Sequence, residues 1–185
     1  MAALKRTQLE YTQWFTGYFA NYYIAPHIKT YITILHAVVN VGNNRAAIPG
    51  SGNMPVAFTY TLDITKFIAA SLTLPKWEPK TYIIGDKLTF NELVALAKSV
   101  KGVKFNITYN SLHILEAGHM SELPSHQAIY SVFPKDRVQS LLSVSGLIFE
   151  SSIYNLKTRR TINQSFPSLK LINMSKLMEK AWKEK

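Results

Sequence analysis

Four residues near the start of the chain are placed where a ligand could bind: Gly17, Tyr18, Phe19 and Asn21. They follow or overlap a stretch that we expect to form a strand, residues 8–16. In open α/β sheets, ligands bind in the crevice beyond the carboxyl ends of the strands. We therefore predict that the four residues line such a crevice. The alternative is that Tyr18, Phe19 and Tyr22 are core aromatic residues at helical spacing.

The chain has one loop that resembles a phosphate-binding turn, Gly50-Ser51-Gly52. A dinucleotide-binding turn needs a strand before it, a helix after it and a third glycine for close packing. Here Pro55 stands at the third position, and an alternating apolar run, Val56 to Tyr60, follows. We therefore predict a β-hairpin over residues 46–60, with its turn at Pro49–Gly52.

Sequence motifs for other chemistries are absent. None of the ten tyrosines has a lysine four residues later, and no Gly-x-Ser-x-Gly elbow exists. The chain has no cysteine, which excludes disulfides, CxxC redox chemistry and thiolate metal sites. The histidines lack metal-ligand spacing, so we expect ordinary surface or core residues. Spacing alone leaves a Ser/His/Asp triad open. We assign no catalytic and no metal-binding residue.

The chain opens with a pattern typical of a buried strand, Leu9 to Phe19, preceded by a short helix, Met1 to Thr7. The strand is apolar or aromatic on both faces, as expected for an interior strand of a parallel sheet that helices cover. Such a strand needs neighbours, and nothing before it in the chain can supply them. We therefore expect the chain to be the second half of a larger fold, with an unpaired edge on this strand.

The remaining pattern predicts an α/β domain with its sheet segment first and a mostly helical region afterwards. Asp63 is predicted to cap a helix, and Thr89 and Glu92 form a capping box. We expect residues 27–45 to be a connector. The expected strands cover residues 81–84 and 103–109. The expected helices cover residues 64–72, 89–101, 111–117, 124–132, 135–149 with a break or bend at Gly146, and 173–185.

Composition narrows the class of protein. With 185 residues and 47% hydrophobic content, the chain is one domain's worth of globular protein. The net charge is +10, but residues 155–185 hold 8 of the 21 Lys and Arg residues and 2 of the 11 Asp and Glu residues. This local excess of positive charge is typical of a solvated helix end, and no nucleic-acid-binding motif accompanies it. We expect no membrane span, no nucleic-acid partner, and a cytoplasmic or alternatively nuclear location.

Four blocks of sequence occur in an order that resembles the C-terminal half of NmrA-like proteins. This family is the isoflavone-reductase-like branch of atypical short-chain dehydrogenases, and the fungal members resemble the chain most. The resemblance spans nearly all 185 residues. The blocks are Leu9 to Tyr23, Val56 to Trp77, Tyr82 to Gly102 and Phe166 to Trp182.

The resemblance implies an incomplete Rossmann-like fold that lacks its N-terminal dinucleotide-binding half. It implies NADP(H) as cofactor, with Gly17 and Tyr18 close to the nicotinamide and Phe19 matching an aromatic residue that covers it; Asn21 lines the same predicted crevice. The family's catalytic lysine would fall upstream of Lys5, so the role is not carried onto Lys5. The parent is then an NAD(P)H-dependent reductase of small molecules, and the chain alone is expected to be inactive. The alternative is a dinucleotide-sensing regulator that binds a protein partner without turnover.

Overall fold

The computed structural model describes residues 3–184; Met1, Ala2 and Lys185, which fall within the predicted terminal helices, lie outside this range. Its strands are β1 (Gln13–Phe15), β2 (Tyr18–Phe19), β3 (Val39–Asn40), β4 (Arg45–Pro49), β5 (Val56–Thr59), β6 (Lys80–Tyr82), β7 (Asp86–Leu88) and β8 (Asn106–Asn110). Its α-helices are α1 (Asn21–Ile24), α2 (Thr61–Ser71), α3 (Phe90–Lys101), α4 (Leu112–Glu116), α5 (Lys135–Glu150) and α6 (Met174–Trp182). Single 3₁₀ turns cover Leu4–Arg6, Pro124–His126 and Ile162–Gln164.

The described strands form three small sheets. β1 pairs with β6 in parallel. β5 pairs with β2 in parallel and with β7 antiparallel. β4 lies between β8, which is parallel to it, and β3, which is antiparallel. The mixture of parallel pairs with helices between them confirms the predicted α/β class.

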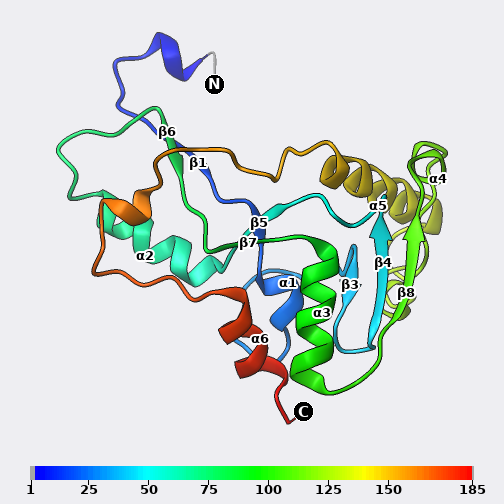
Figure 1. Cartoon of the computed structure of the whole chain (residues 1–185). Coiled ribbons are helices and arrows are strands. Elements are labelled where there is room, and N and C mark those ends of the chain that lie inside the picture. The colour runs from blue at the N-terminus through cyan, green and yellow to red at the C-terminus, as the bar shows by residue number, and fades with distance from the viewer. Residues whose placement is uncertain (1–2, 185) are drawn as a thin grey trace.

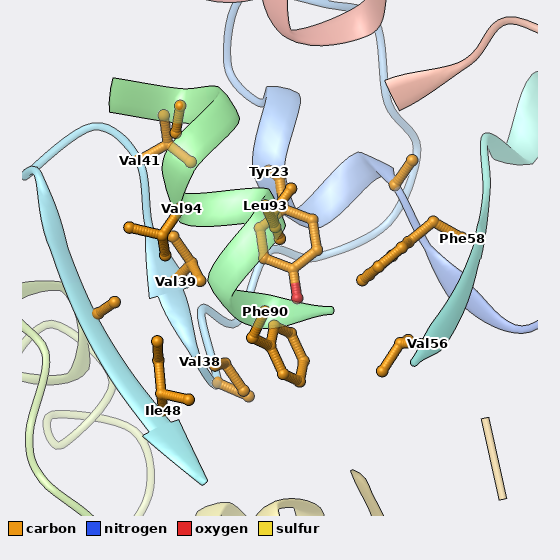
Figure 2. Packing of buried hydrophobic residues seen from close by; sticks show 14 of the residues in the cluster. Tyr23, Val38, Val39, Val41, Ile48, Val56, Phe58, Phe90, Leu93 and Val94 are labelled. Carbon is orange, nitrogen blue, oxygen red and sulfur yellow. The ribbon is translucent and has the colours of Figure 1, made fainter. Parts of the chain in front are cut away.

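The main core lies between the second and third sheets. In Figure 2, Phe90, Leu93 and Val94 of α3 and Tyr23 of α1 lie between β4 and β5. All four side chains are at most 2% exposed. Figure 1 shows α1, α3 and α6 grouped in this middle region, with the β1–β6 pair farther away. A smaller second cluster of buried residues lies on the other side of β2 and consists of Ile64, Phe67, Ile83 and Ile162.

The prediction of one continuous interior strand over residues 9–19 is wrong. The strand is split in two at Gly17, whose φ is +69°, so β1 and β2 join different sheets. Leu9 lies outside both strands and is 68% exposed. β1 pairs with β6 on one edge, and within residues 3–184 no strand pairs with its other edge.

The predicted hairpin over residues 46–60 is also wrong. A turn does occur, because the Gly52 N–H donates to the Pro49 carbonyl at 3.1 Å. However, the flanking strands β4 and β5 do not pair with each other and belong to separate sheets. Each of them finds a parallel partner far away in the sequence, and side chains of α3 fill the space between them (Figure 2).

Both ends of α3 agree with the predictions from the sequence, and local hydrogen bonds also define the starts of α4 and α6. The Thr89–Glu92 capping box is present, and Gly102 ends α3 in the left-handed conformation. Ser111 caps α4 and Asn173 caps α6.

Three predicted features of the helices are wrong. Asp63 does not cap α2, because it lies inside the helix, where its buried carboxylate accepts the N–H of Ile172 at 2.8 Å. Residues 124–132 form one 3₁₀ turn and irregular turns instead of a helix. Finally, the predicted break at Gly146 does not occur in α5, where the missing side chain lets the helix pack closely on Leu115 of α4; the alternative of a bend stays a prediction.

Candidate functional site

The predicted site begins where the chain steps from one sheet to the next. β1 ends at Phe15, and Gly17 turns the backbone so that β2 can join β5. A Cβ atom built on Gly17 would lie 2.2 Å from the carbonyl oxygen of Ala57 in β5. The positive φ and this close approach together require glycine at position 17. The site therefore rests directly on the backbone of β5.

Tyr18 lies in a cluster of aromatic rings. Its ring stacks on Tyr22 at 4.9 Å between centroids and meets the edges of Phe149 at 5.0 Å and Tyr154 at 5.6 Å. Edge-to-face and offset contacts of this kind stabilise aromatic clusters beyond the area they bury. Tyr18 thus ties the first strands to the end of α5 and the segment after it.

Burial keeps the phenols of this cluster protonated. It raises the pKa of Tyr18, and the neighbouring Tyr22 and Tyr154 raise it further. Burial also raises the pKa of Tyr22, of Tyr154 and of fully buried Tyr23. At neutral pH these groups can donate or accept hydrogen bonds. They cannot act as phenolate bases there.

Phe19 points away from Tyr18. Successive side chains of a strand lie on opposite faces, so Phe19 packs against the second cluster while Tyr18 packs against the main core. Its half-buried ring lies with Trp14 and Phe166 at the edge of that cluster. The structure therefore does not bring the two predicted aromatic residues together.

Asn21 is fully buried, and its amide is occupied within the chain. Its Oδ1 accepts the N–H of Thr61 at 3.0 Å, and its Nδ2 donates to the hydroxyls of Thr30 and Thr61 at 2.9 Å each. Thr61 is the first residue of α2, so Asn21 satisfies one of the free N–H groups at that helix start. A role for Asn21 in cofactor binding stays a prediction.

Lys5 is exposed in the 3₁₀ turn Leu4–Arg6. His126 is a buried core residue, since its Nδ1 accepts the Leu123 N–H and its Nε2 lies 2.7 Å from the His36 carbonyl oxygen. Over residues 3–184, no group of three or more His, Asp or Glu side chains could hold a metal ion. Within the same range, no helix is long and apolar enough to cross a membrane.

Sequence reasoning missed Phe149 and Tyr154 as neighbours of Tyr18. They follow it by more than a hundred residues, and no spacing within the chain links them. The contact of Phe149 with Tyr18 depends on the packing of α5 against β4. The contact of Tyr154 with Tyr18 depends on the Ala57 N–H, which donates to the Tyr154 carbonyl at 2.9 Å. Only the tertiary fold places these rings together.

Comparison with known proteins identifies oxidoreductases as relatives. No family model matches the chain. It is 29% identical over 168 residues to Oxidoreductase BOA1 of Botryotinia fuckeliana, which covers 90% of this chain and 52% of that protein. It is 35% identical over 112 residues to Oxidoreductase swnR of Arthroderma benhamiae, which covers 58% of this chain and 36% of the relative. The chain thus spans about half the length, or less, of these relatives.

Solved structures with the same fold include an isoflavone reductase and a nucleoside-diphosphate-sugar epimerase. An isoflavone reductase matches with a TM-score of 0.64 and 16% identity, over 96% of this chain and 54% of that one. The structure of AtPrR2 with NADP⁺ and (+)pinoresinol matches with a TM-score of 0.63 and 20% identity, over 96% of this chain and 53% of that one. The chain is therefore a relative of fungal oxidoreductases and has part of the Rossmann-like fold of the isoflavone-reductase-like, NAD(P)-dependent reductases, about half of it by length.

Proposed function

We propose that this chain supplies the substrate-side part of an NAD(P)H-dependent reductase, which transfers hydride to a carbonyl or alkene of a small molecule. The observation that carries the proposal is the segment Gly17–Asn21, which follows the carboxyl end of a parallel strand in a fold shared with reductases. NADP(H) is the proposed cofactor because the AtPrR2 neighbour was solved with NADP⁺.

In this proposal the four predicted residues have different tasks. Gly17 lets the backbone lie against β5, where any side chain would clash with Ala57. The half-buried edge of Phe19 covers the nicotinamide. Tyr18 supports the loop from the core side and stays protonated. Asn21 holds the loop on the start of α2.

We further propose that residues 1–185 alone do not catalyse hydride transfer. The sequence contains no Gly-x-Gly-x-x-Gly turn to hold a pyrophosphate at a helix N-terminus. It contains no Tyr-x-x-x-Lys pair to donate the proton. Both functions would come from a second polypeptide segment.

A chimera tests this proposal directly. The N-terminal half of Oxidoreductase BOA1 is joined ahead of this chain, and NADPH binding and oxidation are measured with a panel of small carbonyl compounds. We expect the chimera to bind NADPH and oxidise it, and the chain by itself to do neither. Phe19→Ala should weaken NADPH binding, whereas the matched control Phe133→Ala, an exposed residue, should not.

Three other outcomes of the chimera experiment would change or refute the proposal. NADPH binding without oxidation of any substrate would replace the reductase by the dinucleotide-sensing regulator. A folded chimera that does not bind NADPH would refute the proposal. NADPH oxidation by residues 1–185 alone would refute its second part.

A further inference from the structure

A cleft lies at the opposite end of β1 from the segment Gly17–Asn21. It has a volume of about 660 Å³, within the range of ordinary small-molecule sites. Its walls come from residues 71–82 and 158–165, together with Thr12 just before β1. In Figure 1 the Ile162–Gln164 turn lies beside α2, below the β1–β6 pair. The cleft therefore opens at the amino ends of these two strands.

The cleft has a fixed apolar wall. The Trp77 indole N–H donates to the Ser71 carbonyl at 2.8 Å, which holds the ring in place. The Trp77 backbone N–H donates to the Glu10 carboxylate, so the segment is also tied to the chain ahead of β1. Leu74, Pro75 and Ile162 extend the apolar surface. A wall that is already ordered loses little entropy when a ligand packs against it.

Three cations line the same cleft: Lys76, Lys80 and Arg160. One carboxylate, Glu78, accompanies them. Within residues 3–184, none of the three cations has an ion-pair partner, because the two ion pairs found there join Lys66 to Asp63 and Lys135 to Glu122.

The threonine hydroxyls of the cleft bond to neutral groups, and the Lys80 Nζ lies 6.0 Å from the centre of the Phe15 ring. The Thr158 hydroxyl accepts the Arg160 N–H at 3.2 Å and donates to the Arg160 carbonyl at 2.8 Å, which fixes that backbone. The Thr12 and Thr81 hydroxyls lie 2.7 Å apart and bond to each other. The Arg160 guanidinium makes no hydrogen bond to any described residue, so its donors are free for an anion.

We propose that this cleft binds a small organic carboxylate with an aromatic or aliphatic body. The cations would hold the carboxylate, and the wall around Trp77 would cover the apolar body. Guanidinium matches carboxylate geometry with two parallel hydrogen bonds, which suits Arg160 to this role. An inorganic anion would leave the apolar wall uncovered, and a neutral ligand would leave the cations unpaired. The site is independent of the reductase proposal.

Calorimetric titration of residues 1–185 tests the site with three probes. They are 3-phenylpropionate, its neutral counterpart 3-phenyl-1-propanol, and inorganic phosphate. We expect 3-phenylpropionate to bind at least about tenfold more tightly than either of the others, as two partly exposed charge contacts would give. Equal binding of the alcohol would show that the cations play no part. Equal or tighter binding of phosphate would show that the apolar wall plays none.

Two double variants test whether 3-phenylpropionate binds at the cations of the cleft. Lys80→Gln with Arg160→Gln should weaken 3-phenylpropionate binding about tenfold and leave the alcohol unaffected. The matched control, Lys104→Gln with Arg137→Gln, removes two exposed cations outside the cleft and should change neither. Thermal melts confirm that both pairs are folded. No detectable binding of 3-phenylpropionate to the folded chain, or equal weakening by the control pair, would overturn the proposal.

Discussion

The two ends of β1 are built in different ways. At the carboxyl end, residues 17–21 carry no charge, and their contacts are ring packing, close backbone approach and hydrogen bonds inside the chain. At the amino end, three cations line the cleft without an ion-pair partner among residues 3–184, and the cleft walls are partly exposed. Buried contacts dominate folding free energy, whereas exposed charges contribute little to it. We therefore expect changes at the carboxyl end to alter stability, and changes at the amino end mainly to alter binding.

Gly17→Ala gives the strongest test of that contrast. The new Cβ would meet the Ala57 backbone at a positive φ, so we expect the free energy of unfolding to fall by about 3 kcal/mol, measured by urea denaturation. Gly102→Ala is the matched control, because its φ is +65° but nothing lies within 4 Å of the new atom. Its cost should be about 1 kcal/mol. Equal losses would show that the close approach to β5 is not important.

Asn21→Leu should have the next largest effect. It removes the acceptor for the Thr61 N–H and both hydroxyl contacts, so we expect a loss of about 2 kcal/mol in the same measurement. Asn43→Leu, at an exposed position, should change stability by less than about 0.5 kcal/mol. A stable Asn21→Leu protein whose chimera fails to bind NADPH would instead assign Asn21 to the cofactor.

Alkaline unfolding probes the Tyr18 cluster. Because burial raises the pKa of Tyr18 in the folded state, the unfolded chain loses its proton first as the pH rises above about 10. Stability is therefore complete below that pH and falls above it, by about 1.4 kcal/mol per pH unit for each such proton. Tyr18→Phe should make this fall shallower, and Phe19→Leu, which removes no phenol, should not. An unchanged slope in Tyr18→Phe would contradict the assignment.

The smallest effect is expected at the amino end. Thr81→Val breaks the hydroxyl pair with Thr12 and should cost about 1 kcal/mol or less. Thr12→Val should cost about the same, and the double variant no more than either alone, since one bond is lost in all three. Fully additive losses would mean that the two hydroxyls do not bond to each other.

Features set within a few residues could be predicted from the sequence. The Thr89–Glu92 capping box and the stop at Gly102 depend on hydrogen bonds between near neighbours. Such bonds form whenever the local backbone turns, whatever packs against it later. The order of the four sequence blocks likewise carried the resemblance to isoflavone-reductase-like proteins. The fold of the chain matches that of an isoflavone reductase.

Features that depend on distant partners could not be predicted. Asp63 has the local position of a helix cap, but its carboxylate binds the N–H of Ile172, more than a hundred residues away. The apolar runs on either side of Gly50 have the alternation of a hairpin. Instead, β4 pairs in parallel with β8, and β5 pairs in parallel with β2. Tyr18 and Phe19 lie in a strand, as the run Leu9 to Phe19 predicted, but the break at Gly17 and the pairing of β2 with β5 depend on a distant segment.

The sequence by itself determined the α/β class, most helix boundaries, the absence of cysteine chemistry and the reductase-like order of its segments. Periodicity and capping act over one or two turns of chain, so the residues suffice to show them. The tertiary structure decided which strands pair, which way the residues after β1 point, and that unpaired cations gather with Trp77 in one cleft. Those outcomes depend on long-range packing and on desolvation of polar groups, which become defined only when distant segments meet.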